Sequence, residues 1–504
     1  MVKKIKSIAL EKTEGIEADI ETDVSNGLPY FNIVGFADVS AKEASERVRK
    51  AILNSGFNYP KGRVTVNLTP AYLHKRGSHF DLGIAIGILC GSGVISGRTE
   101  DKVFIGELSF DGKILPAKKL IPMLMAVMND ETVEEIIASE TDCREAFLIT
   151  SSFKKKLICV GNLKETVEYI NGKIKAPYKT SYENYENQIV EDFEDVRGHE
   201  EVKEAIMTAV AGGHNLLMIG SPGTGKTMIA KRIPGILPPM SPEEQIETTA
   251  VYSYADRLTD KEPVMIKRPF RHVSAGVTVK ALIGGGRNPV PGEVSLANKG
   301  VLFIDEMLEL APNVLEALRE PIEERKVVIS RNSGTIVFPA DFLLVGAANP
   351  CRCGYLGDKV HECTCSQSEI IRYKNKLSGA LADRIDICVE VHRTDYENLK
   401  GKKGLTSTRM KEIVAEARDV QKKRGCINAF MTDRQVKEFC ILNEEGEAFM
   451  EKAYRTMGIS PRRYYKILKV ARTIADFRKR KIIEVHDLAV ASHYTRFLKG
   501  GRIM

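Results

Sequence analysis

The residues with the clearest chemical potential are a glycine-rich run that ends in Gly-Lys-Thr. The run fits the pattern GxxxxGK[ST] without a mismatch, as Gly220, Ser221, Pro222, Gly223, Thr224, Gly225, Lys226 and Thr227. Glycines allow successive backbone N–H groups to surround phosphate oxygens, and the N-terminus of a following helix adds a partial positive charge. Lys226 is expected to reach the β- and γ-phosphates of a nucleoside triphosphate, and the Thr227 hydroxyl is expected to bind Mg²⁺.

Two further apolar runs end in groups that ATP hydrolysis requires. Residues 300–304 lead to Asp305 and Glu306, and residues 342–348 lead to Asn349. Asp305 fits a contact to Mg²⁺ through water, and Glu306 fits the base that polarises the attacking water. The Asn349 amide is expected to orient that water beside the γ-phosphate. Alone, these residues have plainer interpretations, as surface acids and a turn residue, but their combination with the phosphate loop favours catalysis.

These groups need a sheet that brings the ends of several strands together. The apolar run 216–219 predicts a buried parallel strand before the phosphate loop, and residues 228–232 predict a helix start after it. We also expect strands at 33–36 and 64–68, helices at 40–54 and 82–89, and a hairpin at 327–338. Residues 465–475 predict a helix with two faces. The apolar face holds Ile467, Val470, Ala471 and Ile474, and the other face holds Lys466, Lys469 and Thr473. The predicted fold class is α/β.

The composition is that of an ordinary globular protein. The chain has 504 residues, of which 43% are hydrophobic and 28% are charged, which allows about three domains with buried cores. No apolar run approaches the roughly 20 residues that span a bilayer, so we expect no membrane partner. The basic start lacks the apolar stretch of a signal peptide. Ten cysteines are too few for a disulfide scaffold, so we expect a cytoplasmic, reducing location.

Charge and composition vary along the chain. Residues 400–504 hold 25 Lys and Arg against 12 Asp and Glu, whereas the rest of the chain is slightly acidic. A basic region of this kind suggests a surface that faces a polyanion, and a solvated helical surface is the equally weighted alternative. The segments divide the chain into residues 1–170, a polar linker at 171–195, a nucleotide-binding core at 196–393 and a basic helical region at 394–504.

Several longer stretches match one known family of ATPases. They are residues 213–218 before the phosphate loop, 291–297 before the acidic strand, 349–354, and 377–386. Together they resemble the ComM/YifB family of magnesium-chelatase-like AAA+ ATPases, and the resemblance covers nearly the whole chain. It implies an N-terminal domain that is similar to Lon protease, an AAA+ core, a helical C-terminal lid, and ATP with Mg²⁺ as cofactors.

The resemblance also assigns roles to two arginines. Arg384 matches the arginine finger that enters the ATP site of a neighbouring subunit, and Arg462 matches the second sensor on the lid. Such a finger stabilises transition-state charge and increases the rate by about 10³–10⁵. Without the resemblance, a surface ion pair is the plainer interpretation of each arginine. A finger that acts on a neighbour implies a ring of identical subunits, and the family suggests a hexamer.

Two arginine-bearing loops are candidates for DNA contact. The hairpin at 327–338 carries Arg331, and this AAA+ branch places a hairpin at that point facing the ring pore. The glycine-rich loop at 284–289 carries Arg287. Either arginine could contact a DNA phosphate or be an exposed turn charge, and we weigh the two interpretations equally.

Four cysteines are spaced as two close pairs. Cys351 and Cys353 form one pair, and Cys363 and Cys365 form the other, nine residues further on. Four thiolates fit tetrahedral Zn²⁺, with His361 as a substitute ligand. The alternative, four reduced cysteines in a loop, has equal weight because CxC is less common than CxxC in zinc sites.

The chain departs from its relatives in two places. Alignment puts Phe80 and Ile121 where Lon proteases carry their catalytic serine and lysine, so we expect no peptidase chemistry. A shifted dyad of Ser78 with Lys118 or Lys119 is the alternative. After residues 268–272, the family usually carries paired histidines, and Val273-Ser274-Ala275-Gly276 stands there instead.

These features predict a Mg²⁺-dependent ATPase ring that translocates DNA or migrates DNA branches during recombination or DNA uptake. The alternative is a chelatase-type ATPase that remodels a protein partner. An ATP-dependent protease is disfavoured by the missing dyad.

Overall fold

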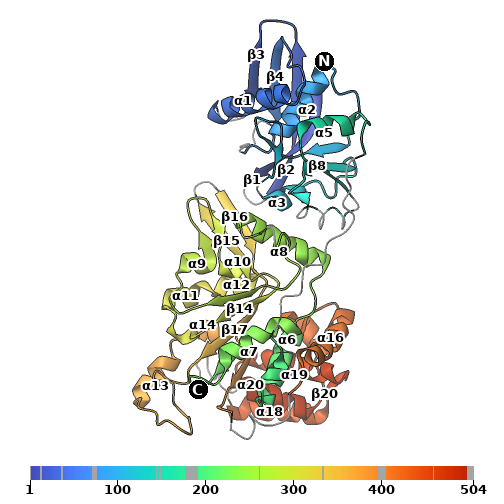
Figure 1. The fold of residues 1–504 in the computed structure, drawn as a ribbon. Helices are drawn as coiled ribbons and strands as arrows, with labels where there is room; N and C mark the ends of the chain where they lie inside the picture. Colours follow the sequence, from blue (N-terminus) through green and yellow to red (C-terminus); the bar gives the residue numbers. More distant parts are fainter. Residues whose placement is uncertain are drawn as a thin grey trace. The chain divides into compact units, whose positions relative to one another are not determined.

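The structure is a computed structural model, and its described residues form two compact units (Figure 1). The first unit comprises residues 1–186 and 241–266, and the second comprises residues 187–240 and 267–504. The described residues are 2–11, 14–35, 38–70, 77–117, 119–143, 146, 150, 153, 155–175, 191–259, 262–331, 334–377, 379–394, 404–457 and 459–495.

The first unit is built on a seven-stranded mixed sheet of order β3-β4-β2-β1-β5-β8-β9. The pairs β1–β2 and β2–β4 are antiparallel, whereas β5, β8 and β9 continue from β1 in parallel. Alternating apolar residues fix the register, so that Ile5 lies opposite Ile20 in the core. The strands are β1 Lys3–Glu11, β2 Glu14–Ser25, β3 Tyr30–Val34, β4 Arg63–Thr69, β5 Lys102–Phe104, β8 Glu135–Ser139 and β9 Lys156–Val160, with a small ribbon of β6 Glu107–Leu108 and β7 Ile114–Leu115.

Helices pack on this sheet, and the most buried of them is α2. Every residue from Asp81 to Leu89 is buried in α2. Glycine allows the close approach, because a Cβ at Gly83 would lie 2.5 Å from the Cδ1 atom of Ile20 on β2. The helices of the unit are α1 Asp38–Asn54, α2 Asp81–Gly91, α3 Leu120–Leu124, α5 Leu163–Ile170 and α8 Pro242–Tyr254.

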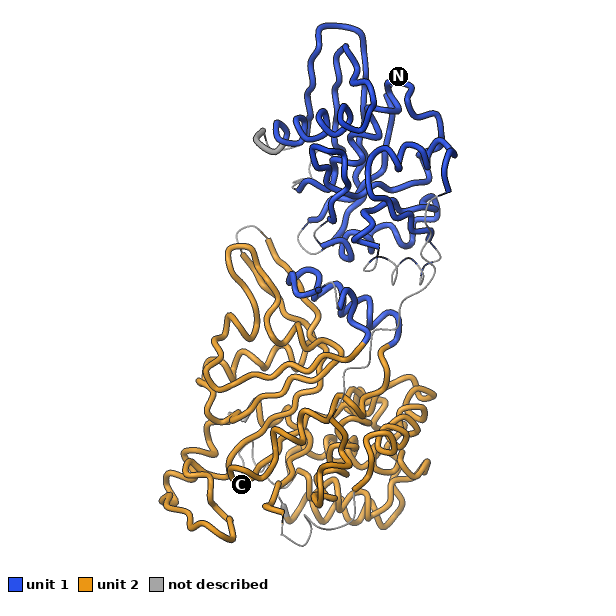
Figure 2. Tube along the Cα trace, viewed as in Figure 1, with its two compact units in different colours: residues 1–186, 241–266 blue, residues 187–240, 267–504 orange. Residues whose placement is uncertain are grey.

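Helix α8 reaches the first unit from the middle of the second unit's sequence (Figure 2). It begins with a capping box formed by Ser241 and Glu244. It packs against α3, and Ile246 joins the buried cluster there. The Lys119 ammonium lies 4.0 Å from the centre of the Tyr254 ring. The sequence reasoning did not foresee that residues 241–266 belong with the N-terminal unit.

The second unit contains a five-stranded sheet of order β11-β14-β17-β10-β18. All four pairings are parallel. Its central strands are short apolar runs, as expected for a sheet covered on both faces. The strands are β10 Leu216–Ile219, β11 Phe270–Val273, β14 Val301–Ile304, β17 Leu343–Ala348 and β18 Ile387–Glu390. Because the strands are parallel, the groups that follow β10, β14 and β17 come out at one edge.

Short helices and two ribbons complete the nucleotide-binding part of this unit. The helices are η1 Phe193–Asp195, α6 Glu200–Gly212, α7 Lys226–Arg232, η2 Ile233–Ile236, α9 Val279–Ile283, α10 Glu293–Leu296, η3 Met307–Glu309, α11 Pro312–Ala317, α12 Arg319–Glu324, α13 Gln367–Lys374 and α14 Gly379–Ala382. The ribbons pair β12 Gly284–Gly285 with β13 Val290–Pro291, and β15 Lys326–Arg331 with β16 Gly334–Pro339. The predicted hairpin at 327–338 is the second ribbon.

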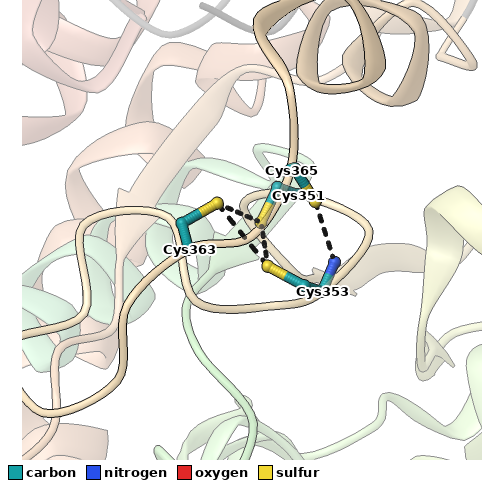
Figure 3. Close-up of side chains that lie close together, drawn as sticks. All are labelled: Cys351, Cys353, Cys363 and Cys365. Carbon is teal, nitrogen blue, oxygen red and sulfur yellow. Dashed lines mark hydrogen bonds between the residues drawn. The ribbon is translucent and has the colours of Figure 1, made fainter.

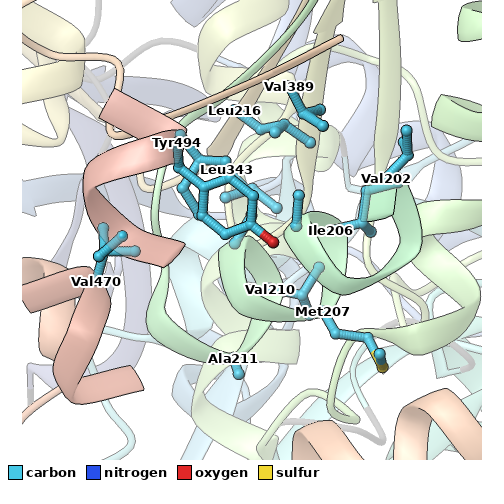
Figure 4. Close-up of a cluster of buried hydrophobic side chains, with 14 of the residues drawn as sticks. Val202, Ile206, Met207, Val210, Ala211, Leu216, Leu343, Val389, Val470 and Tyr494 are labelled. Atoms are coloured by element: carbon cyan, nitrogen blue, oxygen red, sulfur yellow. The ribbon is translucent and has the colours of Figure 1, made fainter. Parts of the chain in front are cut away.

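The C-terminal region is helical and shares its core with the sheet. Figure 4 shows Val202, Ile206 and Val210 of α6 in one buried cluster with Leu216 of β10 and with Tyr494 of the C-terminal helices. Helix α6 therefore joins the sheet to the C-terminal helices. The elements are α16 Ser407–Arg424, η4 Asn428–Phe430, α17 Asp433–Phe439, α18 Glu444–Met457, α19 Pro461–Phe477 and α20 Val485–Thr495, with β19 Ile441–Leu442 pairing β20 Ile482–Ile483.

The face of α19 opposite its apolar residues is also packed inside the fold. Thr473 is fully buried, and its hydroxyl lies 2.8 Å from Nε2 of His214 and accepts a hydrogen bond from the Asn428 amide. The Lys466 ammonium donates to the carbonyls of Asp383 and Ile385. Internal hydrogen bonds thus take the place of water for these groups.

The other predicted elements are present, with small shifts in their bounds. The strand expected at 33–36 runs instead over Tyr30–Val34, and Phe36 lies outside the described residues. One disulfide joins Cys143 to Cys159, which the cysteine spacing did not predict. Among the described residues, no helix combines the length and the apolarity needed to cross a lipid bilayer.

Candidate functional site

The phosphate loop connects β10 to α7. The Lys226 ammonium turns back over the loop and donates to the carbonyls of Gly220 at 2.6 Å and Ser221 at 3.0 Å. Gly223 and Gly225 have φ of 78° and 88°, values that residues with a Cβ adopt only under strain. The first N–H groups of α7 have no acceptor within the helix, so they are available to an anion.

The two neighbouring strands bring the acids and the amide to this loop. The Thr227 hydroxyl donates to Oδ2 of Asp305 at 2.8 Å, and Lys226 donates to Oδ1 of Asn349 at 3.3 Å. The Glu306 N–H donates to Oδ1 of Asp305 at 3.0 Å, with Glu306 in the left-handed region at φ 49°. The structure therefore brings together the residues that the motifs predicted, and their roles in hydrolysis stay predictions.

The donor set fits ATP with Mg²⁺. Burial lowers the pKa of Lys226, and the carboxylates of Asp305 and Glu306 oppose that shift. A buried ammonium held mainly by carbonyl groups can bind phosphate oxygens as a point charge. The Thr227 hydroxyl and the Asp305 carboxylate offer the oxygen ligands that Mg²⁺ prefers.

His272 is a site residue that the sequence reasoning missed. It lies on β11, the strand beside β14, and its Nε2 is 3.9 Å from Oδ2 of Asp305. Its ring lies 5.2 Å from the ring of Phe303. The pairing of β11 with β14 places it there, and the sequence did not show that 270–273 is a strand of this sheet.

The two predicted arginines, Arg384 and Arg462, each form an ion pair with an acidic residue of the same chain. Arg384 forms a salt bridge with Glu323 on α12, which lowers the pKa of Glu323. The backbone carbonyl of Arg384 accepts a hydrogen bond from the side chain of Asn215 at 2.9 Å. Arg462 is half exposed, and its Nη1 lies 3.9 Å from Oδ2 of Asp383. Within one chain, both arginines therefore occupy the ion pairs that were the plainer interpretation.

The two candidate DNA-contacting arginines come from separate segments that meet. Arg287 and Arg331 are both exposed. A Cβ at Gly285 would lie 3.6 Å from Nη2 of Arg331, so the end of the β15–β16 ribbon lies beside the glycine loop that carries Arg287. The Lys280 ammonium lies near the same loop, 3.9 Å from a Cβ at Gly286.

The four paired cysteines converge after Asn349 (Figure 3). The Cys351 sulfur lies 3.3 Å from that of Cys353 and 3.6 Å from that of Cys363, and the Cys353 and Cys363 sulfurs are 3.5 Å apart. Cys365 accepts a hydrogen bond from the Cys353 N–H, and all four sulfurs lie within 4.8 Å of one another.

The four thiols of this cluster differ in their pKa. Burial raises the pKa of Cys353, but hydrogen bonds from the Tyr355 and Thr364 backbone and from neighbouring thiols outweigh it and bring the pKa to about 6, whereas the pKa of each of the other three thiols is raised. Thiolates are the form that binds metal. The substitute ligand His361 instead stacks on Tyr355, with its Nδ1 3.6 Å from Asp358.

The first unit does not assemble the alternative peptidase dyad between Ser78 and Lys119. Ser78 hydrogen-bonds to Glu107, whereas Lys119 lies over the Tyr254 ring. Phe80 and Ile121, at the aligned catalytic positions, are fully buried. Lys118 lies outside the described residues.

Comparisons with known proteins identify the family of this chain. Family models described as magnesium chelatase subunit ChlI, subunit ChlI of Mg-chelatase, and the ChlI C-terminal region match residues 192–399, 20–142 and 404–495. Competence protein ComM of Haemophilus influenzae is 39% identical over 490 residues, which cover 95% of this chain and 94% of that protein.

The chain belongs to the ComM/YifB family of magnesium-chelatase-like proteins. YifB of Escherichia coli is 36% identical over 482 residues, covering 94% of this chain and 93% of YifB. The magnesium-chelatase 38 kDa subunit of Cereibacter sphaeroides is 28% identical over 174 residues, or 31% of this chain and 52% of that subunit. The family resemblance and the α/β fold with a parallel-sheet core and a helical C-terminal region are confirmed. Membership of the ComM/YifB family supports an ATPase that uses Mg²⁺.

Proposed function

We propose that the protein is an AAA+ ATPase that assembles into a homohexameric ring and uses ATP hydrolysis to move DNA during recombination or DNA uptake. The observation that carries the DNA role is the meeting of the Arg287 loop with the end of the ribbon that bears Arg331. Two exposed guanidinium groups and the nearby Lys280 suit a phosphate backbone. The similarity to a competence protein supports the same role.

The chain's own residues supply the steps of hydrolysis. Lys226 and the N–H groups of the phosphate loop bind the phosphates, and Asn349 orients the attacking water. Glu306 accepts a proton from that water as the water oxygen bonds to the γ-phosphorus, while the bond from the γ-phosphorus to the β–γ bridging oxygen breaks and ADP leaves. Thr227 and Asp305 would hold Mg²⁺, which would supply positive charge to offset the charge on the phosphates.

The basic C-terminal region gives weaker support for DNA contact than its charge suggests. Several of its cationic side chains make contacts within the protein and do not face solvent. Arg472 is buried, Arg424 forms a salt bridge with Asp476, and Lys466 donates hydrogen bonds to backbone carbonyls. We therefore assign DNA contact to the two arginine-bearing loops and not to the C-terminal helices.

We also propose Zn²⁺ as a further cofactor. A tetrahedral Zn²⁺ with sulfur bonds of about 2.3 Å places its ligands about 3.8 Å apart. The three measured sulfur distances, 3.3, 3.5 and 3.6 Å, are close to that spacing.

The test is ATP hydrolysis by the full chain with a panel of single-stranded, duplex and branched DNA. We expect DNA to stimulate turnover, and added salt to weaken the stimulation steeply. The double variant Arg287→Ala/Arg331→Ala should keep its basal rate and lose the stimulation. Arg455→Ala is the matched control, because Arg455 is exposed and pairs only locally with Glu451 on α18. A wild-type rate unchanged by every DNA form would refute the DNA role, and a rate that responds to a partner protein would favour chelatase-type remodelling.

A further inference from the structure

The loop between the two cysteine pairs lies directly on the phosphate loop. Gly354 has φ 88°, and a Cβ there would lie 2.8 Å from Cδ of Pro222 and 3.9 Å from Cγ of Asn349. Only a residue without a side chain allows this approach. The first cysteine, Cys351, follows Asn349 by two residues. The start of the loop thus contacts both the phosphate loop and the amide that binds Lys226.

Asp358 is a second residue of the same loop near the phosphate loop. Its side chain is only 3% exposed. The carboxylate accepts hydrogen bonds from the N–H groups of Val360 at 2.8 Å and His361 at 2.9 Å, and it lines the same cavity as Ser221. A carboxylate fixed by its own loop therefore lies beside a residue of the phosphate loop.

The chain beyond the cysteines reaches the acidic end of the same site. Ser366 and Glu369 form a capping box that begins α13 directly after Cys365. Tyr373 on α13 is buried, and the Lys376 ammonium just beyond α13 donates to the Glu309 carboxylate at 2.9 Å. The Glu309 N–H donates to the carbonyl of Glu306 at 2.7 Å. Along the chain, the segment between the two cysteine pairs contacts the phosphate loop, and the segment after them contacts Glu309, which is hydrogen-bonded to the backbone of the proposed base Glu306.

Apolar packing covers residues 354–362 only in part. A cavity of about 320 Å³ is lined by Ser221, Asp358 and Val360 on one side and by Val391 and His392, just after β18, on the other. The exposed fraction of Val360 is 65%. A cross-link at the base of the loop would therefore limit its motion more than its apolar contacts do.

We propose that Zn²⁺ bound by Cys351, Cys353, Cys363 and Cys365 clamps residues 354–362 onto Ser221 and Pro222, so that the geometry of the ATP site depends on this metal. The inference rests on the proposed zinc site and on the ATPase function. Loss of the metal releases the base of the loop, and the phosphate loop loses the contact of Gly354 and the nearby Asp358 carboxylate. Zinc is thus a positioning element of the ATP site and does not touch the reacting atoms.

The first experiment compares metal content, nucleotide affinity and turnover in two cysteine variants. Wild type and the control Cys90→Ser, which changes a partly buried thiol of the first unit, should each hold one zinc ion per chain. Cys363→Ser/Cys365→Ser should hold none. Its turnover should fall by about 10- to 100-fold, the effect expected when reacting groups are displaced by an ångström, and it should bind a fluorescent ATP analogue more weakly.

The second experiment separates the clamp from the metal. Asp358→Ala removes the carboxylate that fixes the loop beside Ser221 and leaves the thiols in place. It should retain a full complement of zinc and lose about 2- to 10-fold in kcat/KM, the worth of one of the hydrogen bonds that fix the loop. Circular dichroism melting checks that the variants are folded.

The outcomes are distinguishable. Wild type without zinc refutes the metal site. Wild type with zinc but without ATP hydrolysis refutes the ATPase, and the affinity for the ATP analogue then still tests the clamp. A folded, zinc-free variant with wild-type affinity and turnover refutes the coupling between the metal and the ATP site.

Discussion

Replacement of Arg384 by alanine tests whether this side chain acts in a neighbouring subunit. Within its own chain, the guanidinium is paired with Glu323; the Arg384 side chain is 9% exposed and the Glu323 side chain 54%. An ion pair with one partner this exposed contributes about 1 kcal/mol to stability, and its loss changes catalysis little. An arginine finger contributes about 10³–10⁵ to turnover, equivalent to about 4–7 kcal/mol of the barrier. The two interpretations therefore differ by orders of magnitude in rate.

Mixing two inactive proteins makes the test specific for a ring. Arg384→Ala keeps an intact phosphate loop, and Lys226→Ala keeps an intact finger. In a random one-to-one mixture, about one quarter of the sites combine an intact loop with an intact finger from the next chain, if the finger acts on a neighbour. Steady-state ATP hydrolysis of the re-assembled mixture should then recover to about that fraction of the wild-type rate.

The control and the refuting result are equally direct. Glu323→Gln removes the charge of the partner within the chain and should keep turnover within about twofold of wild type, because it changes only the half-exposed carboxylate and leaves an amide that can still accept a hydrogen bond. If Arg384→Ala lowers turnover as little as Glu323→Gln does, the finger role is wrong. If both parent variants are inactive and the mixture recovers nothing, Arg384 acts within its own chain.

Three further measurements test the base, a buried histidine and the C-terminal core. Glu306→Gln should bind ATP with near wild-type affinity and lose about 10²–10⁴ in turnover, and an unchanged rate would exclude Glu306 as the base. Burial lowers the pKa of His214 to about 3, whereas its unfolded value is 6.5. Between these two pKa values the unfolded chain binds more protons than the folded chain. The free energy of unfolding should therefore fall by about 1.4 kcal/mol for each pH unit below 6.5 because of this residue. Urea unfolding of His214→Gln should show a shallower pH slope, and an equal slope contradicts the assignment. Ile467→Ala, at a fully buried position, should lose about 2–5 kcal/mol, whereas the exposed Ile482→Ala should change stability by less than about 0.5 kcal/mol.

The ATP site was predictable because its groups follow parallel strands. Apolar runs before Gly220, Asp305 and Asn349 identify the strands, and parallel pairing brings their ends to one edge. His272 was missed because β11 lacks the apolar run of the other strands, so only the pairing shows it. The convergence of the four cysteines was one of two interpretations that their spacing left open, whereas the contact of Gly354 with Pro222 depends on the path of the loop between them.

Buried polar contacts were the least predictable part of the fold. Helical periodicity assigned Thr473 to a polar face, and a hydroxyl gives no indication that its partner is a buried imidazole far away in sequence. Likewise, Lys466 resembles a surface lysine until the loop that bears Asp383 and Ile385 is seen beside it. Such pairings depend on tertiary contacts, which local sequence patterns do not encode.

The insertion of residues 241–266 determines how this protein can be divided in the laboratory. The chain passes between the two units at 186/187, 240/241 and 266/267, so cutting within the linker does not yield two independent halves. A fragment that starts near residue 190 would carry α8 without α3, leaving Ile246 and the Tyr254 ring without their packing partners. An exposed apolar helix face promotes aggregation. A soluble fragment of the ATPase unit would therefore need residues 241–266 replaced by a short linker.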